Sequence, residues 1–368
     1  MYLEMLYQQN LSLVRQMDLS NRNITLIEPN TFNGNQIEFR VRELFLFNNK
    51  LKNVYENTFS NLKSLEQIHL SDNMIEQIDS RSFKNLTSLF WVDLSKNALK
   101  SLKQDQFQNV TNLQVLLLNN NQIESISNQP FDSLINLDRL DLSYNKIDQI
   151  YSTTFQKLTN LTQLYLNNNQ IKSIDMDSFR NNFDLGILTL NNNKLSCIMA
   201  NLFTNMNNLY LLDLSSNQIG YLYAKAFYNL INLGTLNLSG NYISQLDSNT
   251  FVSVPNLSVL ILSNNSLDSS LISIDSFRKE LKKLIKLDLS NNFLNRLDKS
   301  IFDGLINLKI LNLSYNNLRF SQNETDLFNI CSNNVSQTMI DIYITGNQFV
   351  SINYLFNNST NRVCNFKL

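Results

Sequence analysis

The stretch Leu65-Glu-Gln-Ile-His-Leu-Ser-Asp-Asn73-Met-Ile75 recurs 24 residues later as Leu89-Phe-Trp-Val-Asp-Leu-Ser-Lys-Asn97-Ala-Leu99. Both copies share the framework Leu-x-x-Leu-x-Leu-x-x-Asn-x-Leu, in which aliphatic residues replace one another. The framework asparagine occurs at a constant step of 24 residues, at Asn49, Asn73, Asn97, Asn121, Asn145, Asn169, Asn193, Asn217, Asn241 and Asn265. A constant period of this length indicates a solenoid, because each repeat forms one coil that buries its apolar side only against neighbouring coils.

The pattern inside one coil predicts a short strand. We number each coil from its first framework leucine, so that Leu65 is position 1 and Asn73 is position 9. Apolar residues at positions 4 and 6, with a polar residue between them, predict a strand with one face turned inward. The amide of the position-9 asparagine offers two donors and an acceptor, so we expect it to bridge backbone groups of consecutive coils. A phenylalanine at position 19, such as Phe83, predicts an aromatic stack on the return segment.

The 24-residue coil with Asn at position 9 and Phe on the return segment resembles the "typical" subfamily of leucine-rich repeats. Its members include Toll-like receptor ectodomains, Slit, chaoptin and the small leucine-rich proteoglycans. The resemblance implies an α/β solenoid in the form of a horseshoe, with a parallel β-sheet on the concave face and mostly loop or 3-10 structure on the convex face. It also implies an interaction scaffold without a reaction, in a secreted or cell-surface protein.

The two ends of the chain depart from that subfamily. We predict an N-terminal flank at 1–13, a solenoid of about 14 coils at 14–350 and a C-terminal cap at 351–368. The cysteine cluster that usually caps the N-terminus of the family is missing, and Gly346-Asn-Gln-Phe349 stands where the family often has Gly-Asn-Pro. These departures favour a fragment or a degenerate member over an intact receptor.

Three cysteines are too few for a disulfide scaffold. Cys331 and Cys364 flank the last repeat, and we consider a disulfide between them, because the end of a solenoid needs its open core covered. Cys197 lies alone inside a regular coil, where we expect a small, partly buried filler.

Net charge and targeting signals limit the possible partners and cellular settings. Lys+Arg number 30 against Asp+Glu 31, a net charge of −1, so no global field attracts nucleic acid or an anionic membrane. The first residues do not have a signal-peptide pattern, and no apolar run is long enough to span a membrane. Asn-x-Ser/Thr sequons such as those at Asn85, Asn160 and Asn264 are typical of a secreted glycoprotein. Two settings therefore stay open: extracellular or cell surface, and cytoplasmic.

The sequence contains no pattern that indicates catalysis. The single histidine, His69, falls at position 5 without Cys or His neighbours, so we expect no metal site. Asp93 and Asp141 share that position but lie two strands apart, roughly 10 Å, which is wide for an acid/base pair. We therefore predict no enzymatic activity and no cofactor.

Positions 2, 3 and 5 should face solvent, yet several coils carry apolar residues there. This departure from the expected pattern is the feature that indicates a binding surface. Because equivalent positions align across a parallel sheet, these side chains and the charged residues among them predict a protein-binding face. The candidate residues are Phe90, Trp91, Asp93, Val115, Leu117, Arg139, Asp141, Tyr165, Ile187, Tyr210, Leu211, Asp213 and Ile261. We hypothesise a receptor-like module that binds a protein partner on the concave face, without nucleic acid or membrane insertion and with the oligomeric state open. The alternative is an intracellular scaffold or regulatory subunit.

Overall fold

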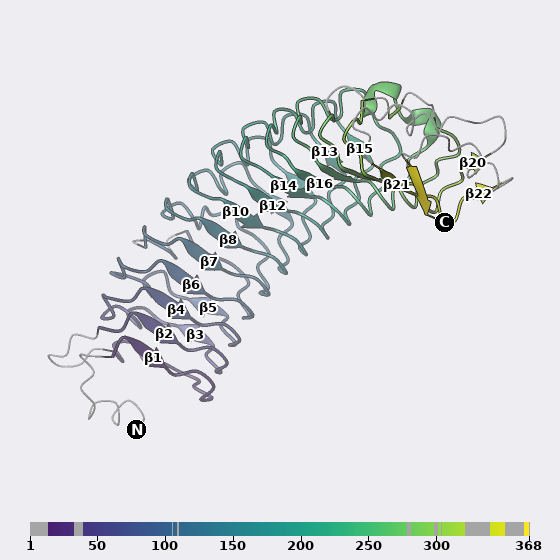
Figure 1. Ribbon diagram of the computed structural model, residues 1–368. Coiled ribbons are helices and arrows are strands. Elements are labelled where there is room, and N and C mark those ends of the chain that lie inside the picture. The colour runs from purple at the N-terminus through teal and green to yellow at the C-terminus, as the bar shows by residue number, and fades with distance from the viewer. Residues whose placement is uncertain are drawn as a thin grey trace. The chain divides into compact units, whose positions relative to one another are not determined.

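The computed structural model describes residues 14–32, 40–104, 106–108, 110–277, 281–297, 301–302, 304–320, 339–349 and 364–367. The chain forms two compact units, Met1–Leu185 and Gly186–Leu368. In both units each described coil contributes one short strand to the main sheet and then returns through turns, some of which include a second short strand (Figure 1).

The sheet of Met1–Leu185 is parallel throughout. Its strands follow one another in chain order: β1 (Gln16–Asp18), β2 (Glu43–Phe45), β4 (Gln67–His69), β6 (Trp91–Asp93), β7 (Val115–Leu117), β8 (Arg139–Asp141) and β10 (Gln163–Tyr165). Shorter parallel pairs lie on the return segments, where β3 (Asn53–Val54) pairs with β5 (Gln77–Ile78) and β9 (Gln149–Ile150) pairs with β11 (Ser173–Ile174).

The sheet of Gly186–Leu368 is built in the same way. Its strands are β12 (Ile187–Thr189), β14 (Leu211–Asp213), β16 (Thr235–Asn237), β17 (Val259–Ile261), β18 (Lys286–Asp288), β19 (Ile310–Asn312), β21 (Ile340–Tyr343) and β23 (Cys364–Lys367). The return segments carry the pairs β13 (Cys197–Ile198) with β15 (Tyr221–Leu222) and β20 (Arg319–Phe320) with β22 (Gln348–Phe349), and the 3-10 turns η2 (Ser269–Leu271) and η3 (Ile274–Ser276).

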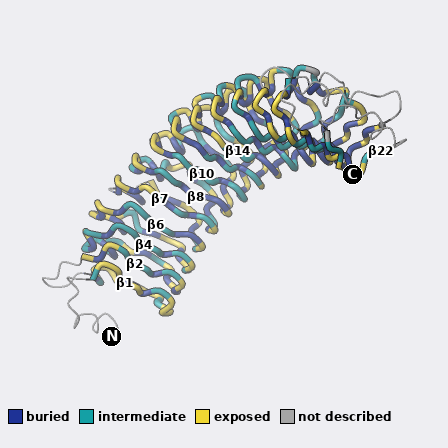
Figure 2. Tube along the Cα trace, in the orientation of Figure 1, coloured by how far each residue is buried: buried dark blue, intermediate teal, exposed yellow. Residues whose placement is uncertain are grey.

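Alternation along each strand separates core from surface. On β4 the central residue Ile68 is fully buried, whereas Gln67 and His69 on either side are half-buried. The same pattern recurs on β6, β7, β8 and β10, and buried segments alternate with exposed ones around each coil (Figure 2). The predicted parallel sheet with one inward face is therefore confirmed.

Position 8 turns the chain sharply out of the strand. Asp72, Lys96 and Asn120 adopt left-handed backbone conformations there, with φ of 53°, 52° and 57°. Asn and Asp tolerate this region better than other side chains, whereas Lys is less suited to it. The turn brings the next residue, the position-9 asparagine, against the backbone of the preceding coil.

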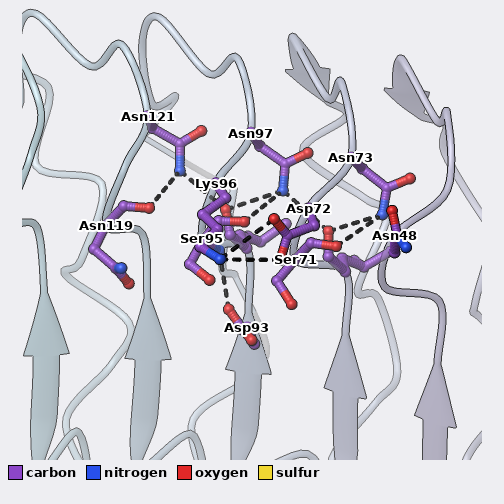
Figure 3. Close-up of polar contacts among 12 residues, drawn as sticks. Asn48, Ser71, Asp72, Asn73, Asp93, Ser95, Lys96, Asn97, Asn119 and Asn121 are labelled. Atoms are coloured by element: carbon purple, nitrogen blue, oxygen red, sulfur yellow. Dashed lines mark hydrogen bonds and ion pairs between the residues drawn. The ribbon is translucent and has the colours of Figure 1, made fainter. Parts of the chain in front are cut away.

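The predicted asparagine ladder is present (Figure 3). Asn73 Oδ1 accepts the N–H of Leu51 at 3.0 Å, and Asn73 Nδ2 donates to the carbonyls of Leu46 at 2.9 Å and Leu70 at 3.1 Å. Leu46 and Leu51 belong to the preceding coil, so one amide joins two coils. In Gly186–Leu368, Asn217 makes the same bonds to Leu190, Leu214 and Leu195.

A phenylalanine stack runs along the return segments of each unit. The rings of Phe59 and Phe83 are stacked with centroids 6.1 Å apart, as are those of Phe83 and Phe107. Phe227 and Phe251 repeat this spacing in the second unit. Each of these rings is almost completely buried, which confirms the predicted aromatic stack within the described residues.

A second row of asparagines, at position 24, was not predicted. Asn112 Nδ2 donates to the carbonyl of Thr87 at 2.7 Å, and Asn136 Nδ2 donates to the carbonyl of Thr111 at 2.9 Å. These bonds join consecutive coils just before each strand begins. The two rows therefore fix the coils to one another at both ends of the strands.

Candidate interaction surface on the sheet

The outward face of the sheet in Met1–Leu185 brings the predicted residues into two aligned rows. At position 3, Trp91 lies beside Val115, and Val115 lies beside Arg139. The row at position 5 runs Asp93, Leu117, Asp141 and Tyr165 on successive strands. All of these side chains are half-buried and flank the buried position-4 core, so they project from the sheet as predicted.

Arg139 is held between an acid and an aromatic ring. Its Nη2 lies 3.9 Å from Asp141 Oδ2, and its Cζ lies 5.0 Å from the centroid of the Tyr165 ring. Asp141 Oδ1 is also fixed, because it accepts from the backbone N–H and the hydroxyl of Ser143 at 3.0 and 2.6 Å. These contacts hold the side chains of this part of the face in defined orientations.

Two buried donors on this face have no hydrogen-bond partner among the residues that the structure describes. They are Trp91 Nε1 and Arg139 Nε, at the same position on strands β6 and β8. A buried donor without an acceptor costs about 1–3 kcal/mol. Such groups are uncommon in folded proteins, and two of them on one face mark it as a place to look for function.

An aromatic row extends this surface toward the N-terminal strands; we use the name for Phe47, Phe45, His69 and Trp91. The His69 imidazole stacks on the Phe45 ring at 4.9 Å and 15°, and the Trp91 ring lies 6.4 Å from the imidazole. Phe47 meets Phe45 edge to face at 6.3 Å. Sequence reasoning missed Phe45 and Phe47, although Phe45 and His69 occupy position 5 in consecutive coils and could have been aligned.

Carboxylates lie around the aromatic row. Glu43 is two residues before Phe45 on β2 and accepts a hydrogen bond from Gln16 Nε2 at 2.8 Å. Asp93 lies opposite His69 and accepts the backbone N–H of Ser95 at 2.9 Å. Burial lowers the pKa of His69 below its ordinary 6.5, and this effect outweighs Asp93 and Glu43, which act in the opposite direction. The imidazole is therefore neutral at pH 7.

In Gly186–Leu368 the predicted residues also face outward. Ile187 lies beside Leu211, and Asn237 joins Asp213 to Ile261 in the position-5 row. Tyr210 is 51% exposed. Its backbone pairs with Gly186 and Gly234, the position-2 residues on either side, which have no side chains to cover its ring.

A groove of about 570 Å³ borders the sheet of Met1–Leu185 where its strands begin. Its lining includes Gln114 at position 2 and the asparagines of the second row. Phe90, one of the predicted surface residues, also lines this groove. The lining is mainly amide, with Asp138 as its carboxylate. The groove therefore adjoins the two aligned rows at the beginning of the strands.

Among the described residues, no group of three His, Cys, Asp or Glu is arranged to hold a metal ion, and no helix is both long and apolar enough to span a membrane. Cys197 is a free, half-buried thiol on β13. The suggested Cys331–Cys364 disulfide lies outside the described residues, since the structure describes neither Cys331 nor the side chain of Cys364.

Several solved structures are similar to this one. The crystal structure of a TLR13–ssRNA13 complex shares 25% sequence identity, with a TM-score of 0.76 over 96% of this chain and 54% of the TLR13 chain. A leucine-rich repeat protein of Leptospira interrogans shares 22% identity, with a TM-score of 0.71 over 98% of this chain and 97% of that one. A chain of the Toll–Spatzle complex of Drosophila shares 23% identity, with a TM-score of 0.69 over 89% of this chain and 46% of that one. The chain thus spans about half the length of the TLR13 chain.

No curated protein sequence matches the chain significantly. The leucine-rich repeat family model matches residues 39–99, 91–147, 111–171, 159–219, 207–267 and 272–325. These matches cover most of the chain and coincide with the coils that carry the asparagine ladder. The protein therefore belongs to the leucine-rich repeat family.

Proposed function

We propose that this protein is a non-enzymatic recognition module that binds a protein partner on the outward face of the sheet in Met1–Leu185. The observation that carries the proposal is the aligned rows of half-exposed Trp91, Val115, Leu117 and Tyr165 side chains, interrupted by charged groups. Trp, Tyr and Arg are the residue types most often found at the energetic centres of interfaces. An exposed apolar surface with polar groups inside it is typical of a protein-binding site.

The charge of this face favours a protein over a nucleic acid. Positions 2, 3 and 5 of its strands carry six carboxylates, Asp18, Glu43, Glu66, Asp93, Asp138 and Asp141, against three guanidinium groups, Arg15, Arg42 and Arg139. Phosphate groups bind where Lys and Arg are in excess, so the face lacks the charge that RNA or DNA requires. The similar TLR13 structure contains ssRNA, which makes nucleic acid the competitor that a binding test must include.

We further propose a secreted or cell-surface setting, with an intracellular scaffold as the alternative. The resemblance to the "typical" repeat subfamily supports the extracellular setting, as do the exposed sequon asparagines Asn85, Asn160 and Asn264. Not every sequon fits glycosylation, because Asn237 and Asn312 lie within β16 and β19. The intact mass of protein from its own source, before and after glycosidase treatment, decides between the two settings.

Site-specific photo-crosslinking tests the binding face. A photoreactive residue is placed at Leu117, on the outward face, and as a control at Lys84, which is exposed on a return segment. We expect Leu117 and not Lys84 to capture a protein, and Trp91→Ala to reduce the affinity of that purified protein at least about tenfold, as removal of an energetic centre does. Equal capture from both positions, or capture of nucleic acid alone, would reject the proposal.

A further inference from the structure

We propose that the groove beside the sheet of Met1–Leu185 binds a neutral oligosaccharide of two or three sugar units. The groove lies where the strands begin, and its lining includes neither Trp91 nor Leu117 of the proposed protein-binding face. The inference therefore goes beyond the proposed function and does not depend on it. Three features of the lining support it: unused hydrogen-bonding groups, an aromatic ring and the repetition of polar groups along the groove.

The amides of the groove keep hydrogen-bonding capacity after they have joined the coils. Asn112 and Asn136 each donate one N–H to a carbonyl of the preceding coil, which leaves each amide a second N–H. Asn136 Oδ1 accepts from Asn160 Nδ2 at 3.4 Å. The amide of Gln114 is exposed and has no hydrogen-bond partner among the described residues. The lining therefore offers donors and acceptors side by side, which suits hydroxyl groups because each hydroxyl both donates and accepts.

Asp138 is the carboxylate of the lining. One of its oxygens accepts a hydrogen bond from the hydroxyl of Thr162, and the carboxylate forms no ion pair among the described residues. Its second oxygen is therefore available to a ligand hydroxyl, in a bond that the negative charge strengthens. No Lys or Arg is among the described residues that line the groove, so it does not attract phosphate, sulfate or carboxylate groups. This balance of charge favours a neutral ligand.

Phe90 gives the groove an apolar surface. The side chain is half-buried at position 2 of its coil and lines the groove, and among the described residues no other aromatic ring packs on it. The face of an aromatic ring carries negative electrostatic potential. A pyranose ring presents weakly positive C–H groups on its faces and hydroxyls around its edge. A ring beside amides and a carboxylate therefore matches both parts of a sugar.

The coils repeat polar groups along the groove. Its lining comes from four consecutive coils between Ser88 and Asn160, so it spans three strand spacings, or roughly 14 Å. An extended chain of two or three sugars covers about this length. The volume of about 570 Å³ lies within the range of pockets that hold small ligands. The size of the groove thus fits a short oligosaccharide.

Saturation-transfer difference NMR on the intact protein tests the groove. The protein is produced in bacteria, so that Asn160, which begins a sequon, is not glycosylated. The probes are triacetylchitotriose, cellotriose and mannotriose, and N-acetyl-triglycine amide serves as a neutral peptide without a sugar face. We expect a saturable signal from at least one trisaccharide, with a Kd on the order of millimolar, and none from the peptide. No saturable signal from any trisaccharide, or an equal signal from the peptide, would overturn the inference.

Variants show whether the sugar lies in the groove. Phe90→Ala and Gln114→Ala should each weaken trisaccharide binding about fivefold or more, because each removes one contact of the ligand. The matched controls are Phe293→Ala, at an exposed position 10, and Gln108→Ala, at an exposed position on a return segment; both should leave the Kd unchanged. Equal weakening by the controls, or an unchanged Kd in Phe90→Ala, contradicts the inference. Far-UV circular dichroism confirms that each variant is folded.

Asp138→Asn tests the carboxylate separately. It keeps the shape of the side chain and removes the charge, so it should weaken trisaccharide binding about threefold or more while the peptide stays without effect. A Kd equal to that of the unsubstituted protein would exclude the carboxylate from the site and with it the proposed arrangement.

The two proposals can fail separately, because the trisaccharide titration needs no partner protein. Capture of a protein at Leu117 together with no trisaccharide response leaves the recognition module and rejects the oligosaccharide site. Trisaccharide binding together with capture of nucleic acid alone does the reverse. Where both succeed, glycosidase treatment of the captured protein identifies the source of the sugar: lower affinity afterwards places the sugar on the partner, and unchanged affinity indicates a free oligosaccharide.

Discussion

The imidazole of His69 stacks on the ring of Phe45, with centroids 4.9 Å apart and an angle of 15° between the planes. Burial in this stack lowers the pKa of His69 from 6.5, so the folded protein holds a proton there less tightly than the unfolded chain does. The neutral imidazole is therefore part of the stable folded state at pH 7.

Acid should accordingly destabilise the fold through this residue. Because the pKa of His69 is lower in the folded protein, the contribution of its neutral form to the free energy of unfolding is complete above pH 6.5. This contribution decreases as the pH falls from 6.5 toward the folded-state pKa. Urea titrations at pH 7.5 and 5.5 should show a larger loss of stability for the unsubstituted protein than for His69→Phe, in which the group cannot titrate. The carboxylates are common to both proteins and cancel in this comparison, so equal losses would exclude His69 as the source.

The asparagine ladder predicts a large effect from one amide. Asn217→Ala removes the donor to the carbonyls of Leu190 and Leu214 and leaves the buried N–H of Leu195 without an acceptor. Each buried group left unpaired costs about 1–3 kcal/mol, so we expect a destabilisation of at least about 2 kcal/mol in urea. Asn232→Ala is the control, since its single exposed bond to Asn207 should contribute less than about 1 kcal/mol. Equal costs would mean that burial of the amide does not matter.

The phenylalanine stack predicts a cavity. Phe155 is fully buried between Phe131 and Phe179, with centroids 6.3 and 6.2 Å away, and Leu164 is fully buried on β10. Phe155→Ala or Leu164→Ala should destabilise by about 2–5 kcal/mol, because the rigid neighbouring coils cannot close the space. The matched control is Phe183→Ala, whose ring is 49% exposed. A change below about 1 kcal/mol for Phe155→Ala in a denaturant titration would contradict its role in the core.

The sequence repeat predicts those structural features that the consensus residues within each coil determine. The strand at positions 3 to 5 and the position-9 ladder follow from local patterns, and both appear in the structure. Strand β23 could not be predicted, because Cys364–Lys367 lacks the framework leucines. It pairs with β21 through its backbone and through a hydrogen bond that Asn365 Nδ2 donates to Asp341 Oδ1 at 2.8 Å. The second asparagine row was missed because position 24 varies: it is Ser88 in one coil and Asn112 in the next.

The candidate surface could be predicted only in part. Alignment of positions places Trp91 beside Val115 and Ile187 beside Leu211, as the structure does. Phe45 and His69 belong to adjacent coils, and their stacking depends on the conformations of the two side chains. Residue spacing in the sequence does not predict those conformations. The unpaired Trp91 and Arg139 donors are likewise visible only once their neighbours are placed.

Trp91 tests the proposed binding face of Met1–Leu185, and Tyr210 tests whether a partner also contacts the outward face of Gly186–Leu368. Both project from the sheet, Trp91 from β6 and Tyr210 from just before β14, and Tyr210 is 51% exposed. Neither residue is at the buried position 4 of its strand, so Trp91→Ala and Tyr210→Ala should weaken partner binding while Tm falls by no more than a few degrees. Binding affinity and a thermal melt on the same preparation check this. If the loss of binding only follows a loss of stability, the rings belong to the core and the outward face is not the site of recognition.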